Sequence, residues 1–175
     1  GYVGVHLGLI ALTASEDELA SVLAHELSHV SQRHIARSLG SASRQNTASM
    51  VAMLLGVLAA SRVGNADMAQ AAIVGSQAAA LQGQLNFSRD MEREADRIGF
   101  GIFSEAGFGP AGMAGIFDKL DQAGRLNDSG AFPYLRTHPL TAERVAEARA
   151  RLVGAPGIGR RGSTVVHAMM RARAR

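Results

Sequence analysis

The residues best suited to bind a metal or to catalyse a reaction are His25, Glu26 and His29, in the run His-Glu-Leu-Ser-His. Residues four apart on a helix share a face, so His25 and His29 can direct two imidazoles at one metal ion. Glu26 lies to one side of that pair, where it can reach a water bound to the same metal and take its proton. The spacing therefore predicts a zinc site with Glu26 as the general base.

Glu26 also falls on the apolar side of the helix that we predict here. At about 100° per residue, it lies inside the hydrophobic stripe centred near Leu23. A carboxylate that faces a core is costly unless a partner receives it, so its position favours a functional role. The structural alternative is a pair of satisfied histidines next to an incidental Glu.

Zinc needs a third protein ligand, and the absence of Cys leaves His, Asp or Glu as candidates. Gln32 and Ile35 stand where the metzincin motif has Gly and His, which excludes that class. His34 is one residue away from that spacing, and we interpret it as a histidine near a helix end.

Residues 90–99, Asp-Met-Glu-Arg-Glu-Ala-Asp-Arg-Ile-Gly, offer a better third ligand. Glu92 and Asp96 are four apart and share a face of a second predicted helix, beside its apolar stripe. If the two helices pack together, Glu92 completes a two-His-one-carboxylate set, and Asp96 accepts the free ring N–H of a ligand histidine. Glu94 remains the rival acid, because carboxylates four apart on a helix are often solvated.

The elements that must position these groups are mostly helices. Ser15 and Glu18 have the spacing of a capping box, so we expect the first helix to begin after Ser15 and to end near Leu39–Gly40. Further helices are expected over 89–106, from Pro110 onward, and over 141–153, with a loop at 124–137.

Two segments differ from this helical pattern. Residues 2–12 are rich in Val, Leu, Ile and Tyr and are predicted to form a strand. Residues 40–83 are rich in Ser, Ala, Gly and Gln, which predicts two short helices or one helix and a mobile flap. The candidate roles of 40–83 are a lid, a membrane-contacting patch or a helical hairpin of the core.

Composition indicates one globular domain. The chain has 175 residues, 47% hydrophobic and 19% charged, which excludes a disordered protein. The lack of Cys excludes a disulfide scaffold and a cysteine nucleophile, and a net charge of +3 is too small to indicate a nucleic acid partner. The longest apolar run is 50–60, shorter than the roughly 20 residues of a membrane span. We therefore expect no transmembrane segment, with 50–60 as the candidate for peripheral membrane contact.

Three segments, in order, resemble the motifs of one zinc metallopeptidase family. The family includes the CAAX prenyl protease and the heat-shock membrane protease, and the similarity is greatest to its periplasmic members. The segments read Ala-His-Glu-Leu-Ser-His-Val-Ser-Gln-Arg-His, Ser-Arg-Asp-Met-Glu-Arg-Glu-Ala-Asp-Arg-Ile-Gly and Arg-Thr-His-Pro-Leu-Thr-Ala-Glu-Arg-Val. The resemblance covers residues 1–153.

The resemblance implies a mainly helical (α+β) fold, a gluzincin-type metalloprotease domain with a small β-sheet beside the active-site helix. It implies one Zn²⁺ per chain and favours Glu92 over Glu94, because the first Glu of Glu-x-Glu-Ala-Asp binds zinc in the family. We expect a metallopeptidase domain over 1–153, with its N-terminal part missing and a mobile or lid-like insert at 40–83. Residues 154–175 are expected to form a basic, Gly- and Arg-rich tail or linker.

The third motif contributes His138 and Arg144. Pro139 biases His138 toward an extended conformation at a helix entrance, and Arg144 lies one turn into that helix. We expect both to face the metal from the far side, with His138 donating to the oxyanion of the tetrahedral intermediate, as the family suggests. A sharper hypothesis is a latent state in which His138 is itself a fourth metal ligand.

We predict a zinc-dependent endopeptidase that cleaves protein substrates, with His25, His29 and Glu92 as metal ligands. The resemblance implies the periplasm and outer-membrane protein quality control, with unfolded outer-membrane proteins or their assembly machinery as partners. The alternative is a zinc-stabilised chaperone or binding module with little or no proteolysis. A helical domain without metal is a third hypothesis.

Overall fold

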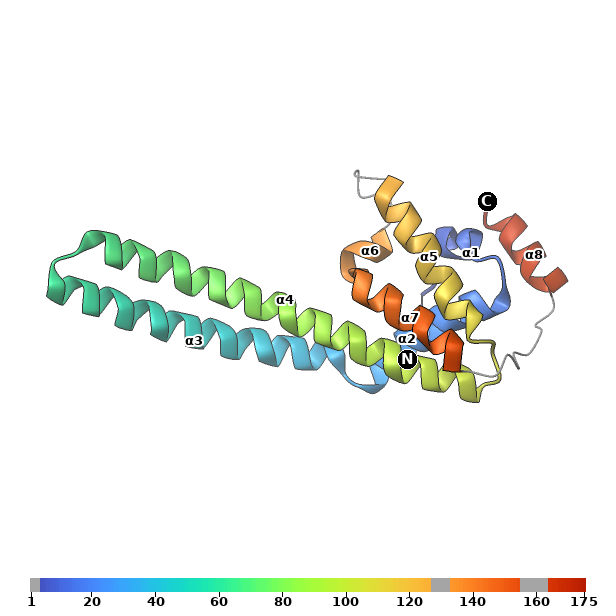
Figure 1. Ribbon diagram of the computed structural model, residues 1–175, viewed down its shortest axis with the longest axis horizontal. Coiled ribbons are helices and arrows are strands. Elements are labelled where there is room, and N and C mark those ends of the chain that lie inside the picture. Colours follow the sequence, from blue (N-terminus) through green and yellow to red (C-terminus); the bar gives the residue numbers. More distant parts are fainter. Residues whose placement is uncertain (1–3, 127–132, 155–163) are drawn as a thin grey trace. The chain divides into compact units, whose positions relative to one another are not determined.

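The computed structural model describes residues 4–126, 133–154 and 164–175, and within these ranges the chain forms helices and no strand (Figure 1). The helices are α1 (Leu7–Leu12), α2 (Glu16–Ser31), α3 (His34–Val63), α4 (Ala66–Glu105), α5 (Ala111–Leu126), α6 (Pro133–Thr137), α7 (Ala142–Gly154) and α8 (Thr164–Arg173). The prediction of a mainly helical fold is confirmed. The chain divides into two compact units. The first unit comprises Gly1–His29 and Glu92–Arg175, and the hairpin unit comprises Val30–Met91.

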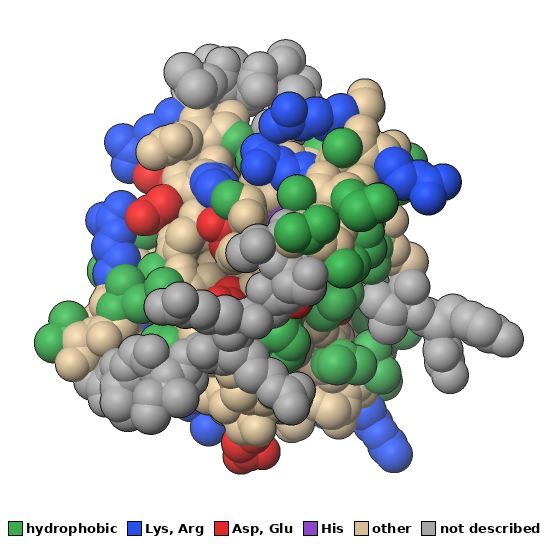
Figure 2. Space-filling model, turned by 90° about the vertical axis from the view of Figure 1, so that its right-hand side faces the viewer, with side chains coloured by type: hydrophobic (Ala, Val, Ile, Leu, Met, Phe, Trp, Pro, Cys, Tyr) green, Lys and Arg blue, Asp and Glu red, His purple; other side chains and the backbone are tan. Residues whose placement is uncertain are grey.

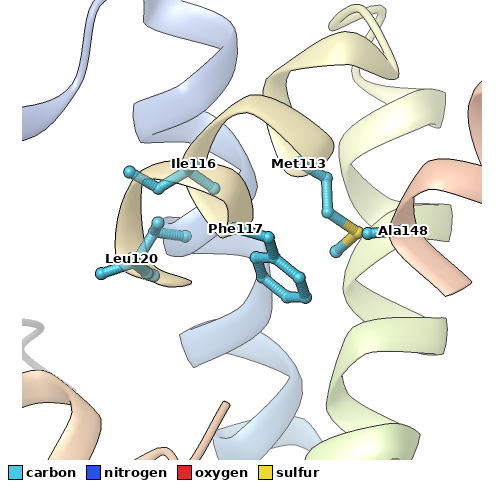
Figure 3. Close-up of a cluster of buried hydrophobic side chains, with 6 residues drawn as sticks. Met113, Ile116, Phe117, Leu120 and Ala148 are labelled. Atoms are coloured by element: carbon cyan, nitrogen blue, oxygen red, sulfur yellow. The ribbon is translucent and has the colours of Figure 1, made fainter. Parts of the chain in front are cut away.

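The core of the first unit lies where α5 packs against α7 and α2. Four residues of α5, at the i, i+3, i+4 and i+7 spacing of a helical stripe, point into it together with Val22 and Ala148. The α5 residues are Met113, Ile116, Phe117 and Leu120, as Figure 3 shows. These residues belong to the helix that the sequence predicts from Pro110 onward.

The start of α2 agrees with the predicted capping box. Ser15 Oγ accepts a hydrogen bond from the Glu18 N–H at 3.2 Å, and Glu18 also accepts one from the Ala14 N–H. The predicted end near Gly40 is wrong, because α2 ends at Ser31 and α3 begins at His34. Arg33 separates them in the left-handed region, at φ 53°, so one continuous helix is broken at a residue type that gives no sequence signal of a break.

The strand predicted over residues 2–12, and the small β-sheet with it, are not found in the described part of the chain. Leu7–Leu12 forms the short helix α1, and His6 Nδ1 accepts a hydrogen bond from the Gly8 N–H at its start. A strand needs a partner for its backbone groups, and the described residues provide no second strand. A helical turn satisfies those groups locally.

The remaining predicted elements are recovered with shifted boundaries. The helix expected over 89–106 ends at Glu105 but begins at Ala66, and Gly107 follows at φ 84°. The helix expected over 141–153 is α7. In the segment expected to be a loop, α5 continues to Leu126 and α6 forms over Pro133–Thr137.

The C-terminal segment expected as a tail contains α8, which packs against α1. His167 is buried and its Nε2 lies 3.2 Å from Thr13 Oγ1, while Arg171 donates to the Ala11 carbonyl at 3.1 Å. Residues 155–163 of the expected tail lie outside the described residues. Figure 2 shows the face that carries α8, where hydrophobic side chains gather on one side.

The hairpin unit consists of α3 and the first part of α4, which run antiparallel and are joined at Gly64 and Asn65 (Figure 1). Gly56 marks their close approach, because a Cβ there would lie 2.5 Å from the Ala72 Cβ. Residues 40–83 therefore form two long helices instead of two short ones or a helix and a flap.

Helix α3 corrects the expectation that no segment could span a membrane. Among the described residues it is the helix that is long and apolar enough to do so, by length and composition alone. The uninterrupted apolar run at 50–60 is short. The helix that contains it has 30 residues, and many of the others are Ala, Ser or Gly, which are small and uncharged. Core helices and secretion signals meet the same criteria, although only 6% of this apolar window is buried.

Candidate metal centre

Helices α2 and α4 bring together three side chains of the first unit that could hold a metal ion. His25 and His29 lie one turn apart on α2, and their Nε2 atoms are 2.9 Å apart. Glu92 of α4 places Oε2 3.4 Å from His25 Nε2 and Oε1 3.3 Å from His29 Nε2. Gly99 permits this approach of the helices, because a Cβ there would lie 3.0 Å from the His25 backbone nitrogen.

His138 joins this group from the segment between α6 and α7. Its Nδ1 lies 3.1 Å from Glu92 Oε1, and its ring centroid is 5.0 Å from that of His29. One potential ligand atom from each of His25, His29, Glu92 and His138 lies within 4.8 Å of the others. The structure thus brings together the three predicted ligands and the predicted fourth, and we call these four residues the ligand group.

The donor set fits a zinc ion. Tetrahedral zinc with ligands at about 2.0–2.1 Å places neighbouring ligand atoms about 3.3 Å apart, close to the observed separations around Glu92. The Nε2 atoms of His25 and His29 face each other at 2.9 Å, so both neutral rings can direct a lone pair at one cation. Glu92 Oε2 is also buried without an aligned hydrogen bond.

Asp96 and Arg144 lie behind the ligands. Asp96 Oδ1 is 2.9 Å from His25 Nδ1, on the opposite side of the ring from the ligand nitrogen. Arg144 makes a bidentate contact with Asp96, at 2.6 Å from Nε and 2.9 Å from Nη2. Its Nη1 lies 2.9 Å from Glu92 Oε2 and donates to the Pro139 carbonyl at 2.7 Å. The guanidinium is thus buried and fully engaged, whereas the sequence placed it facing the metal.

Glu26 lies at the edge of the ligand group. Its side chain is partly exposed, at 28%, and its Oε1 is 3.5 Å from His138 Nε2. That oxygen is itself buried and accepts no hydrogen bond from a protein donor. The carboxylate can therefore accept a proton from a water beside the ligands.

Tyr134 of α6 is a site residue that the sequence reasoning missed. Its ring stacks on His138, with centroids 4.7 Å apart and an angle of 23° between the planes. Burial, followed by the nearby charge of Glu26, raises the pKa of the Tyr134 hydroxyl well above its usual value. The phenol therefore stays protonated and is a permanent donor. Its position four residues before His138, in a segment predicted to be a loop, gave no periodic signal.

The charged groups depend strongly on one another in the metal-free site. Burial alone lowers the pKa of His25, but hydrogen bonding to Asp96 and Glu92 outweighs it and raises the pKa to about 9. Burial opposes ionisation of Glu92 and Asp96 too, yet the contacts of Glu92 with His138 and those of Asp96 with Arg144 hold both pKa values below the ordinary range. Both carboxylates are therefore ionised and available to a cation.

The rival ligands from the sequence are not part of this group. His34 begins α3 in the hairpin unit, and Glu94 is partly exposed on α4. Neither belongs to the cluster of metal-ligating side chains found among the described residues. Two residues along α4 turn a side chain by about 200°, so Glu92 and Glu94 cannot both face α2.

Comparisons with known proteins agree with this geometry. Residues 1–152 match the model of Peptidase family M48. The chain is 40% identical over 151 residues to the putative beta-barrel assembly-enhancing protease of Vibrio cholerae, covering 86% of this chain and 31% of that protein. It is 39% identical over 151 residues to the beta-barrel assembly-enhancing protease of Escherichia coli K12, covering 86% and 30%. It is also 29% identical to the metalloprotease LoiP of Escherichia coli K12, covering 87% and 56%.

This chain spans less than a third of the length of the two assembly-enhancing proteases. The match to the family model nevertheless covers most of the chain and includes every residue of the ligand group. The cofactor of this family is zinc, which the His and Glu donors suit. The chain therefore belongs to Peptidase family M48, a family of zinc metallopeptidases.

Proposed function

We propose that this chain is a zinc metalloendopeptidase domain in which His25, His29 and Glu92 hold the metal. The observation that carries the proposal is the convergence of these three side chains, with the carboxylate of Glu26 at their edge. A structural zinc site does not require a fifth polar group such as Glu26, which is partly exposed and accepts no hydrogen bond. A hydrolytic site needs such a group as a base.

The chemistry that zinc supplies at such a site is Lewis acidity, which polarises a carbonyl and makes a water more acidic. Glu26 accepts a proton from the attacking water at its carboxylate and then transfers that proton to the departing amine. Asp96 fixes the orientation of the His25 ring through Nδ1, so that Nε2 points to the metal. Arg144 places its single positive charge against both buried carboxylates and fixes their positions, which makes it a positioning residue.

His138 has two roles within this proposal. In the active state its N–H donates to the oxyanion that forms on the substrate carbonyl, the role expected from the sequence. In a latent state its ring becomes the fourth ligand, which the 3.1 Å separation of Nδ1 from Glu92 Oε1 supports. Stacking on Tyr134 limits the positions that the ring can adopt between these states.

The biological role that we infer is proteolysis in outer-membrane protein quality control, in the periplasm. It rests on the names of the relatives, two of which are beta-barrel assembly-enhancing proteases. The expected substrates are unfolded outer-membrane proteins or components of their assembly machinery.

The second candidate is a zinc-stabilised chaperone module, favoured by the one observation that four protein side chains lie within reach of one ion. A zinc ion held by four protein ligands leaves no position for water or substrate. An unfolded protein substrate separates the two functions: a zinc-loaded peptidase cleaves it and Glu26→Gln loses that cleavage, whereas a chaperone module suppresses its aggregation equally well with Glu26 or with Gln at this position.

The decisive test replaces Glu26 by Gln in the full chain. We expect this variant to bind one zinc ion per chain, measured by elemental analysis, and to lose cleavage of an unfolded protein substrate by a factor of about 10³ or more. The matched control Glu16→Gln changes a carboxylate in the first turn of the same helix and should cleave normally. Proteolysis preserved in Glu26→Gln would overturn the assignment of the base.

A further inference from the structure

The hairpin unit exposes a hydrophobic surface that the metal site does not use. Five large apolar residues on α3 are between 51 and 62% exposed, and we call them the α3 stripe. They are Met50, Val51, Leu54, Leu55 and Leu58. Met50, Leu54 and Leu58 recur every four residues, with Val51 and Leu55 beside them, so the five residues form one continuous face of the helix.

The α3 stripe faces away from the partner helix of the hairpin. The side of α3 that packs on α4 is marked by Gly56, which approaches Ala72, and by Ser49, which donates to the Ser76 carbonyl at 3.0 Å. At about 100° per residue, Gly56 and Ser49 lie roughly opposite the centre of the stripe. Packing within the hairpin therefore cannot cover it.

The hairpin carries few charged residues, and these lie near its ends. Between residues 45 and 88 the charged side chains are Arg62 and Asp67, both next to the turn at Gly64 and Asn65. Soluble helices that remain exposed to water normally carry charged residues along their outer face. The long uncharged part of this hairpin therefore does not resemble the surface of a helix that remains exposed to water.

Basic residues border the α3 stripe. Arg44 and Arg62 are both exposed, and they are five helical turns apart, so they lie on the same side of α3, along the edge that carries Leu55. An apolar stripe with arginines along its edge is the arrangement of helices that lie in a membrane interface. The aliphatic part of each Arg covers apolar surface while the guanidinium reaches anionic headgroups.

The apolar character of α3 fits neither a secretion signal nor a core helix. A secretion signal is removed, but α3 lies between His29 and Glu92, so its removal would separate the metal ligands. A core helix is mostly buried, whereas only 6% of the apolar window of α3 is buried.

We propose that the α3 stripe is a membrane-docking surface, with Arg44 and Arg62 binding anionic lipid headgroups while α3 lies along the bilayer. Attachment is peripheral, because spanning would carry Arg62 and Asp67 at the tip through hydrocarbon. The expected result is that the chain acts on substrates at the surface of an anionic membrane. Action on substrates there rests on the peptidase function proposed above, whereas binding of the α3 stripe to a membrane does not depend on it.

The first test measures binding of the zinc-loaded chain to vesicles by flotation. We expect binding to vesicles of phosphatidylglycerol and phosphatidylethanolamine and at least about tenfold weaker binding to phosphatidylcholine alone. The double variant Leu54→Gln/Leu58→Gln should reduce binding about tenfold or more. Replacing either Arg44 or Arg62 by Gln should reduce it about fivefold and weaken its dependence on salt.

A matched control places the same side chains elsewhere on α3. Ala52 and Ala59 lie off the stripe, so Ala52→Gln/Ala59→Gln should bind vesicles within about twofold of the parent chain. Equal helicity of both double variants by circular dichroism shows that neither loss reflects unfolding. Equal loss in both pairs, or no binding to anionic vesicles by the parent chain, overturns the proposal.

A second measurement uses the absence of Trp in the chain. Emission of Leu54→Trp should shift to shorter wavelength on anionic vesicles, while emission of Ala52→Trp, about 160° away around the helix, should not. Sedimentation without lipid completes the test, because a dimer that Leu54→Gln/Leu58→Gln dissociates would assign the stripe to a second copy of the chain and overturn the membrane proposal.

Discussion

Asp96 connects the two halves of the site, because it contacts a proposed metal ligand on one side and a buried cation on the other. Its carboxylate lies 2.9 Å from His25 Nδ1 and receives two hydrogen bonds from Arg144. Removing its charge leaves the guanidinium of Arg144 with Glu92 as its remaining anionic partner. Glu92 would then bind Arg144 more strongly and offer less negative charge to a metal ion.

We therefore expect Asp96→Asn to weaken zinc binding about 10–100-fold, the usual effect of losing a group that orients a ligand histidine. Competition with a chromogenic chelator measures this affinity. Asp121→Asn is the control, since Asp121 pairs with Arg125 on α5 and has no contact with the ligand group. An unchanged zinc affinity in Asp96→Asn would show that the Asp96 contact does not orient His25.

Helix geometry could predict which side chains share a face, whereas the choice of Glu92 over Glu94 as the proposed third ligand came from the resemblance to the family. His25, His29 and the pair Glu92 and Asp96 each repeat at four residues, which places them on one face before any tertiary contact is known. Tyr134 could not be predicted, because it contributes through stacking on His138, a contact that needs the path of the chain between α5 and α7. The orientation of Arg144 depends on the same path.

At the level of elements, α2 and α4 approach each other closely because residue 99 of α4 is Gly and has no side chain. Gly99 is buried where α4 meets the backbone of α2 at Ala24 and His25. The sequence indicated this helix pair. It could not indicate the break at Arg33, because left-handed conformation at an Arg depends on the surrounding packing. The strand expected over 2–12 failed because composition cannot supply a strand partner.

Gly99→Ala should separate α2 from α4, because the added Cβ would lie 3.0 Å from the His25 nitrogen and 3.1 Å from its Cα. We expect a loss of about 1–3 kcal/mol in the free energy of unfolding, measured with urea, and weaker zinc binding. Gly101→Ala on the same helix meets nothing within 4 Å and should be neutral or stabilising, up to about 1 kcal/mol. Equal effects of both substitutions would contradict the close approach.

For the whole molecule, the division into two units means that the proposed zinc site belongs to the first unit alone and stabilises that unit. The ligand group draws on α2, α4 and the segment before α7, all within the first unit. No residue of the group lies between Val30 and Met91. The sequence indicated a change of composition at residues 40–83 and gave a helical hairpin as one of three candidates. It could not indicate the length of the two helices, because Ala, Ser and Gly patterns are shared by flaps and helices.

Removal of zinc by a chelator should therefore destabilise the first unit selectively. With zinc at about 1,000 times its dissociation constant, binding adds about 4 kcal/mol to stability, which chelation removes. Amide hydrogen exchange should accelerate over residues 16–29 and 92–105 and stay unchanged over 45–85. Acceleration of equal size in both ranges would show that the hairpin unfolds with the first unit.

The position of the hairpin between His29 and Glu92 has a consequence for a cut chain. A single cleavage at the turn around Gly64 leaves both histidines of α2 on one fragment and both Glu92 and His138 on the other. Neither piece would then carry the complete set of proposed ligands, so zinc would add a link between two fragments that the packing of α3 on α4 and the core of the first unit already join. We expect limited digestion at the turn to give a nicked protein whose two fragments separate more readily in denaturant when a chelator has removed the metal.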